Sequence, residues 1–285
     1  MTQKLPEFLA VGHVTLDQLD TGITPGGSAL YAAITASRLR MPAGILTSMG
    51  DDFPRMQVFS GFQYRYTKSP HTTSFINRYA GRRSQQIRAV ADHIGGDSIP
   101  AEWTHIPVVY FCPVAGEIGA ELIHRLQPTL AGAGLQGWLR TWDEEGSVWP
   151  ARWKNGPSLL RHFHMVIMSE EDVAGMEDIV DECRRVVPMV FLTRGARGSI
   201  LFLKGRRYHI PAYSALDIDP TGAGDVFGAA FMVAYYRSRN WNKAAIIASC
   251  AASLAVEARG ITGIPTAKAV SARLRQFGCR HPIEV

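Results

Sequence analysis

The sequence has few charged residues and few cysteines, and it has no long apolar run. Charged residues make up 19% of the 285 residues and hydrophobic residues 46%. This balance excludes a disordered chain and allows a substantial core. The four cysteines are widely separated and lack paired metal-ligand spacing, which excludes a cysteine-based zinc site and a disulfide scaffold. We therefore expect a globular protein of a reducing cytoplasm.

Secretory and membrane-spanning signals are also missing. The opening residues, MTQKLPEFLAVGHV, show no basic region followed by a long apolar stretch. The longest apolar stretches, Phe227–Tyr236 and Ala244–Val256, are too short to cross a bilayer and are expected as buried helices. The formal net charge of +5 comes from scattered residues, with no basic run. We therefore expect neither a membrane nor a nucleic-acid partner, and the excess charge indicates either steering of phosphate ligands or a solvated surface.

Short apolar runs alternate with helical patterns along the chain. Strands are expected at Phe8–Val11, Ala43–Ser48, Val108–Cys112, Met165–Met168, Val190–Thr193 and Ser199–Leu203. Helices are expected at Ala29–Arg38, Ile118–Leu130, Glu171–Val186, Gly224–Arg237 and Lys243–Ala258. The alternation predicts an α/β fold over residues 1–285, in which helices cover both faces of a mostly parallel sheet.

Two regions interrupt this alternation. Residues Thr73–Val90 alternate with period two on either side of Gly81, which predicts a two-stranded hairpin. Such a hairpin needs support from the main body, so a lid over a site and an ordinary edge hairpin are both compatible with the pattern. Residues Trp138–Pro157 have no clean period and contain four tryptophans. They predict an ordered loop whose tryptophans serve packing.

The most informative stretch is DPTGAGD, residues Asp219–Asp225, which runs directly into an apolar helix. Its Gly-Ala-Gly residues leave the backbone open where a helix begins, and the first amides of a helix lack internal partners. Such a cluster of amides can bind an anion such as a transferred phosphoryl group. A carboxylate at Asp225 would repel phosphate, so it fits a general base for a substrate hydroxyl, or alternatively a simple helix cap.

This stretch closely resembles the C-terminal signature of the ribokinase-like, or PfkB, carbohydrate-kinase family, D-T-x-G-A-G-D-x-F. The resemblance implies a three-layer α/β/α ribokinase-like fold with a small β lid, and an ATP- and Mg²⁺-dependent kinase. It makes Asp225 the catalytic base and Gly222, Ala223 and Gly224 the anion hole. Asp219 matches a position that helps to bind a monovalent cation such as K⁺, although Pro220 stands where Thr is usual.

The resemblance extends to the acceptor side of the family's site. The segment GHVTLD makes Asp17 a ligand for substrate hydroxyls. The segment PGGSALY resembles the family's G-G-x-x-x-N signature, with Gly26 and Gly27 facing the acceptor and Tyr31 in place of Asn. Only eight residues separate Asp17 from Gly26, so we expect the lid to come mainly from the Thr73–Val90 hairpin.

Three further residues are predicted to contact the acceptor. Arg82 lies at the turn of the expected hairpin, where it either reaches the substrate or is solvated. The segment QGWLR stands where the family commonly shows D-P-N-x-R, keeping Arg140 but placing Gln136 first. This variant resembles the myo-inositol kinase branch of the family.

On the donor side, MSEED resembles the family's N-x-x-E segment and makes Asp172 a magnesium ligand through water, or alternatively part of a helix start. The segment TRGARG resembles the family's phosphate-approaching T-x-G-x-x-G. The residues from ASCAASL resemble the helix that lines the adenine pocket. The resulting ATP-binding predictions are Thr193, Gly195, Gly198, Ala248, Ser249 and Ala252.

These features predict a kinase that phosphorylates a hydroxyl of a sugar or polyol, with myo-inositol as one candidate acceptor. A nucleoside kinase of the same fold and a catalytically silent nucleotide or metabolite sensor are the alternatives. The segment GAGLQG fits a dinucleotide-binding pattern but lacks the strand before and the helix after that this pattern needs. The oligomeric state is expected to be a monomer or a homodimer.

Overall fold

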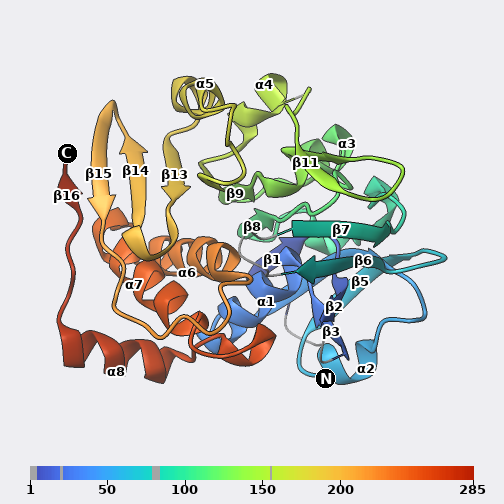
Figure 1. The fold of residues 1–285 in the computed structure, drawn as a ribbon, viewed down its shortest axis with the longest axis horizontal. Helices are drawn as coiled ribbons and strands as arrows, with labels where there is room; N and C mark the ends of the chain where they lie inside the picture. The colour runs from blue at the N-terminus through green and yellow to red at the C-terminus, as the bar shows by residue number, and fades with distance from the viewer. Residues whose placement is uncertain (1–4, 20–21, 79–83, 155) are drawn as a thin grey trace.

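The computed structural model describes residues 5–19, 22–78, 84–154 and 156–285 (Figure 1). Its main sheet has ten strands in the order β16-β15-β14-β13-β12-β9-β8-β1-β4-β5. The strands from β13 to β5 are parallel, and β14, β15 and β16 are antiparallel to their neighbours. The bounds are β1 Phe8–Val11, β4 Ala43–Met49, β5 Gln63–Lys68, β8 Val108–Phe111, β9 Leu130–Gly134, β12 Met165–Ser169, β13 Met189–Thr193, β14 Ser199–Leu203, β15 Arg206–Ile210 and β16 Ile283–Glu284.

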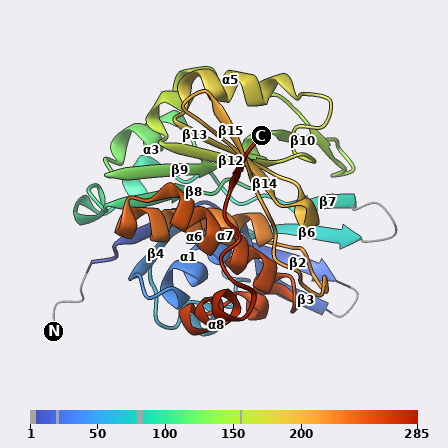
Figure 2. The same ribbon diagram turned by 90° about the vertical axis from the view of Figure 1, so that its left-hand side faces the viewer.

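Helices cover both faces of this sheet, as Figure 2 shows from the side. One face carries α1 Ser28–Arg38, α6 Ala223–Ser238, α7 Trp241–Ala255 and α8 Ala267–Phe277, and the other carries α3 Ala120–Arg125, α4 Gly156–Leu159 and α5 Asp178–Val186. A further short helix, α2 Arg55–Val58, precedes β5. Helix α6 is buried without interruption from Val226 to Ala234, because it lies between the sheet and α7. The predicted three-layer α/β/α fold is confirmed.

A second, four-stranded sheet has the order β3-β2-β6-β7. Its strands are β2 Thr15–Leu19, β3 Gly22–Gly26, β6 Thr73–Arg78 and β7 Ser84–Ala89. Strand β2 pairs with β3 in antiparallel and with β6 in parallel orientation. This second sheet stands where the lid was expected. The expectation that the lid comes mainly from the Thr73–Val90 hairpin is wrong, because β2 and β3, which follow β1, form a hairpin of their own in the same sheet.

A buried histidine joins the second sheet to the main body. His13 is fully buried between β1 and β2, and its Nδ1 lies 2.7 Å from the Oγ1 of Thr73 at the start of β6. Its Nε2 lies 3.0 Å from the carbonyl oxygen of Asp92, beyond β7. The two ring nitrogens thus hold the start of β6 and the segment just after β7 close to the end of β1.

Two predicted helices are shorter than their patterns indicated. The Ile118–Leu130 pattern yields only α3, because Pro128 disfavours a helical conformation before it and β9 begins at Leu130. The Glu171–Val186 pattern yields only α5, because Gly175 adopts a positive φ of 77° and ends the preceding turn. No helix in the described ranges is both long enough and apolar enough to cross a membrane.

The tryptophan-rich segment contains more structure than the predicted loop. Strands β10 Arg140–Trp142 and β11 Val148–Pro150 form an antiparallel hairpin, closed by a turn in which Gly146 has a φ of 82°. The rings of Trp138 and Trp153 stack with centroids 4.0 Å apart. The predicted packing role of the tryptophans is confirmed for this pair.

Candidate active site

A cavity of about 1020 Å³ opens between the second sheet, the carboxyl ends of the main parallel strands and the start of α6. Open parallel sheets bind ligands at this edge. Most of the residues predicted from the sequence line it. They are Asp17, Gly27, Tyr31, Gln136, Arg140, Asp172, Thr193, Gly195, Gly198, Gly222, Ala223, Gly224, Asp225, Ser249 and Ala252.

The start of α6 forms one wall of the cavity. Gly222 is the N-cap residue, in the left-handed conformation with φ 75°. A Cβ added there would lie 2.2 Å from the ring of Tyr31, so the close approach of this ring requires glycine. The amide of Ala223 donates to the carbonyl of Pro220 at 3.2 Å, whereas helix geometry leaves the amide of Gly224 without an intrahelical acceptor. Asp225 is the third residue of α6 and hence not its N-cap.

The acceptor side of the cavity is built largely from the second sheet. Asp17 is nearly buried, and its Oδ1 accepts a hydrogen bond of 3.0 Å from the Oγ1 of Thr15. Gly26 does not line the cavity. A Cβ at Gly26 would lie 2.4 Å from the Oδ2 of Asp17, so this glycine makes room for the carboxylate.

The strands β6 and β7 add polar side chains to the same side. Gln85 donates from its Nε2 to the Oδ1 of Asn77 at 2.8 Å, and both residues line the cavity. The guanidinium of Arg140 lies 5.9 Å from the centroid of the Phe75 ring. Asn77 and Phe75 were not predicted as site residues; the period-two alternation of Thr73–Val90 was the signal that could have placed them on one face. Arg82 lies outside the described residues.

The donor side follows the ends of β12 and β13. The Oδ2 of Asp172 accepts from the amide of Ser169 at 2.8 Å, and the Oγ of Ser169 accepts from the amide of Asp172 at 3.1 Å. This is the reciprocal pattern of a capping box, although the turn does not continue as a helix. Because Oδ2 is used in this way, Oδ1 is the oxygen suited to bind water near a magnesium ion.

The loop after β13 brings backbone and positive charge to the cavity. Gly198 has a φ of 79°, and a Cβ there would lie 2.1 Å from the carbonyl oxygen of Ile210. Arg194 lines the cavity, and its buried Nε has no hydrogen-bond partner among the described residues. A buried donor on a cation is costly unless it finds an acceptor, and a phosphate oxygen would supply one.

Helix α7 presents one face to the cavity. Its lining residues Ser249, Ala252, Ser253 and Val256 recur at the spacing of a single helix face. Ala248 points elsewhere on the helix and is fully buried, so the structure does not bring it to the cavity.

Arg280 also lines the cavity, and sequence reasoning missed it because no motif surrounds it. Its Nη1 donates to the carbonyl of Ala212 at 2.7 Å, and its guanidinium lies 5.3 Å from the Tyr213 ring centroid.

Asp219 lies behind the cavity and does not line it. Its Oδ1 accepts from the amide of Thr221 at 3.0 Å, and its Oδ2 accepts from the amide of Gly260 at 2.9 Å. The carboxylate thus ties the loop before α6 to the loop after α7. Its role with a monovalent cation stays a prediction. No group of three or more His, Cys, Asp or Glu side chains able to hold a metal occurs within the part of the chain that the structure describes.

A buried carboxylate supports the floor beside β8. Glu117 is almost fully buried and accepts from the amides of His13 at 2.7 Å, Val114 at 3.0 Å and Ala115 at 2.8 Å. It therefore holds the loop after β8 against the end of β1. Nearby, burial and, to a smaller extent, the charges of Asp225 and Glu117 raise the pKa of the Cys112 thiol well above its usual range. Cys112 is thus a neutral thiol.

Comparison with known proteins identifies a matching family model and solved structures with the same fold. Residues 159–267 match the model of the pfkB family carbohydrate kinases. A solved pyrophosphate-dependent kinase of the ribokinase family, complexed with a pyrophosphate analogue and myo-inositol, superposes with a TM-score of 0.77 at 23% identity, covering 93% of this chain and 99% of the other. Residues 159–267 thus match the pfkB family, and the chain has the ribokinase-like fold.

Two further proteins match over most of their length. A cytidine kinase of Thermococcus kodakarensis is 26% identical over 256 residues, which cover 82% of this chain and 90% of the relative. The structure of a fructokinase from Xylella fastidiosa with bound ATP has a TM-score of 0.75 at 15% identity, covering 95% of this chain and 99% of the other. These three comparisons bring together polyol, nucleoside and sugar kinases.

Proposed function

We propose that this protein transfers the terminal phosphoryl group of ATP to a hydroxyl of a small sugar, polyol or nucleoside. The observation that carries the proposal is the position of Asp225 in the first turn of α6, beside the Gly222–Gly224 backbone and within the cavity that Asp17 lines from the opposite side. Asp17, which would bind the acceptor, and Asp225, which would take its proton, thus line one cavity. The main-chain amides at the start of α6 line the same cavity and are suited to bind phosphate.

Each group has a separate task in the transfer. Asp17 accepts hydrogen bonds from acceptor hydroxyls and orients the one that reacts. Asp225 accepts the proton of that hydroxyl as its oxygen attacks the phosphorus. The amide of Gly224, aided by the positive end of the α6 dipole, stabilises the negative charge on the transferred group. The second sheet covers the site and excludes water that would otherwise hydrolyse the donor.

The donor side suits a magnesium-bound nucleotide. Mg²⁺ keeps several waters and needs few direct protein ligands, so Asp172 can hold it through water, and the ion would neutralise charge on the phosphates. Thr193, Gly195 and Arg194 line the same cavity and would offer main-chain donors and positive charge to the phosphate chain. Asp219 remains the candidate for helping to bind a monovalent cation such as K⁺. It would do so by holding the loop before α6 in place through its hydrogen bonds to the amides of Thr221 and Gly260.

ATP is favoured as the donor because the cavity continues past the phosphate region to the α7 face, where Ser249 and Ala252 leave room for a purine. Pyrophosphate is the alternative, since one structural neighbour uses it. The two are separated by measuring phosphorylated product with each donor in turn.

Two acceptor classes compete. The resemblance of QGWLR to the myo-inositol kinase branch, together with the amide side chains of Asn77 and Gln85, favours a polyol. The long match to a cytidine kinase favours a nucleoside. A coupled assay of ADP release over inositols, pentoses, hexoses and nucleosides distinguishes them.

The variant Asp225→Asn tests the reaction itself. It should keep ATP affinity, measured by calorimetry, while acceptor-dependent turnover falls by roughly 10²–10⁴-fold, the usual contribution of a general base. Turnover near the wild-type rate would refute the role of Asp225. ATP binding by the wild type with no acceptor-stimulated turnover across the screen would favour a sensor.

A further inference from the structure

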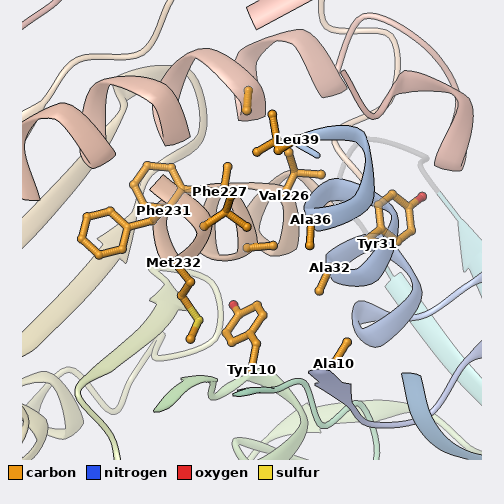
Figure 3. Packing of buried hydrophobic residues seen from close by; sticks show 14 of the residues in the cluster. Ala10, Tyr31, Ala32, Ala36, Leu39, Tyr110, Val226, Phe227, Phe231 and Met232 are labelled. Atoms are coloured by element: carbon orange, nitrogen blue, oxygen red, sulfur yellow. The ribbon is translucent and has the colours of Figure 1, made fainter. Parts of the chain in front are cut away.

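A tyrosine hydroxyl without a partner lies at the floor of the cavity. Tyr110 belongs to β8 in the middle of the main sheet, paired with Ala10 of β1 and Gly132 of β9. Its side chain stands up from the sheet toward α6, with the hydroxyl at the end nearest the helix (Figure 3). The residue is fully buried, yet it lines the cavity. Among the described residues its hydroxyl has no hydrogen-bond partner.

Glycines on two elements make room for this hydroxyl. A Cβ at Gly228 of α6 would lie 2.2 Å from it, and a Cβ at Gly134, the last residue of β9, would lie 3.3 Å from it. Both backbones thus leave room for the Tyr110 hydroxyl, and Tyr110 lines the cavity. Asp225 precedes Gly228 by three residues and hence lies on the same face of α6, one turn nearer the open end of the helix.

The surroundings keep Tyr110 a proton donor. Burial, followed by electrostatic interactions with Cys112 and Asp225, raises the pKa of its phenol well above the usual range. An unpartnered buried hydroxyl costs free energy that a purely structural phenylalanine would not, so its presence beside the site calls for a functional partner.

We propose that Tyr110 is a positioning residue for Asp225, whose carboxylate accepts a hydrogen bond from the Tyr110 hydroxyl, directly or through one bound water. The proposal rests on the function proposed above for Asp225. The bond occupies one carboxylate oxygen from below and directs the other toward the acceptor hydroxyl. Tyr110 keeps its proton throughout, and the acceptor's proton passes to Asp225.

The charged and titratable groups around this pair are limited in kind. The Tyr110 phenol on β8 and the Cys112 thiol just after β8 interact electrostatically with the Asp225 carboxylate, and Glu117 interacts with Cys112. The other titratable or charged groups that line the cavity near the proposed acceptor site are Asp17, Tyr31 and Arg140. The phenol is the group that Gly228 and Gly134 approach most closely.

The test is Tyr110→Phe, which removes one oxygen and keeps the ring. We expect kcat to fall on the order of tenfold, the loss typical of one hydrogen bond to a charged group, with the KM values for acceptor and ATP unchanged. A hydrogen bond to the ionised form lowers a carboxylate's pKa. The acid limb of the kcat profile should therefore move to higher pH in the variant.

Two controls separate the possible failures. Tyr64→Phe makes the same change on β5, where the ring packs against Phe59 and Tyr66 outside the cavity, and it should leave kcat and the pH profile unchanged. If Asp225→Asn is inactive but Tyr110→Phe matches the wild type in kcat and pH profile, the inference is wrong and the proposed function stands. An active Asp225→Asn would remove the proposed function itself.

Discussion

Replacing Gly222 by alanine tests whether the start of α6 is fixed by backbone conformation and by close packing together. The residue has a φ of 75°, a conformation that costs a residue with a Cβ about 1–2 kcal/mol. The added methyl would also lie 2.2 Å from the Tyr31 ring, and overpacking of this kind costs about 1–3 kcal/mol. The free energy of unfolding should therefore fall by about 2–5 kcal/mol, measured by urea denaturation with two-state fitting.

Gly224→Ala is the matched control, two residues along the same turn. A Cβ at Gly224 meets no atom within 4 Å and its φ is not positive, so this variant should be as stable as the wild type or more so. In a Tyr31→Ala background the steric part of the Gly222→Ala cost should disappear while the backbone part of about 1–2 kcal/mol remains. Equal stabilities of Gly222→Ala and Gly224→Ala would refute the reasoning.

Three further substitutions give independent checks. Burial lowers the pKa of His164, so its stabilising contribution is present above the ordinary value and is lost as the pH falls through the lowered one. Because Asn can replace the Nδ1 that accepts from the Ala131 amide, His164→Asn should flatten the loss of unfolding free energy as the pH falls below the ordinary pKa of histidine in urea titrations. Glu117→Gln replaces one accepting oxygen by an amide NH₂ that faces main-chain N–H donors. It should lower the free energy of unfolding by about 1–3 kcal/mol in the same assay. Asp17→Asn should raise the acceptor KM by roughly 10–100-fold while calorimetric ATP affinity stays the same, and an unchanged KM would contradict its role.

The sequence predicted those elements whose pattern is local. The buried run after Asp225 and the glycines before it specify both the helix α6 and its open first turn, so the cavity wall could be placed before any coordinates were known. The parallel strands β1, β4, β8, β12 and β13 were predicted within a residue or two at each end, because continuous apolar runs bounded by turn residues are typical of strands buried on both faces. The parallel strands β5 and β9 were not predicted.

The parts that were missed depend on distant contacts. The stretch around Gly22 and Gly26 is poor in strand-forming residues, and β3 exists because β2 provides a partner. Helical spacing could not tell that Ser249 faces the cavity and Ala248 does not, since both belong to a helix that is apolar nearly all round. Arg280 reaches the cavity only because the chain returns past β15 at its end, which no local motif reports.

The second sheet carries Asp17 and Asn77, so part of the proposed acceptor site lies on the sheet that covers the cavity. Under the proposed function, each hydrogen bond between the acceptor and these side chains would also hold the second sheet against the main body. A molecule that fits poorly would lose its own hydrogen bonds and would also leave the second sheet less firmly held over the site. Discrimination between acceptors would then depend on how completely the second sheet covers the cavity. Turnover number, more than apparent affinity, should then rank the acceptors.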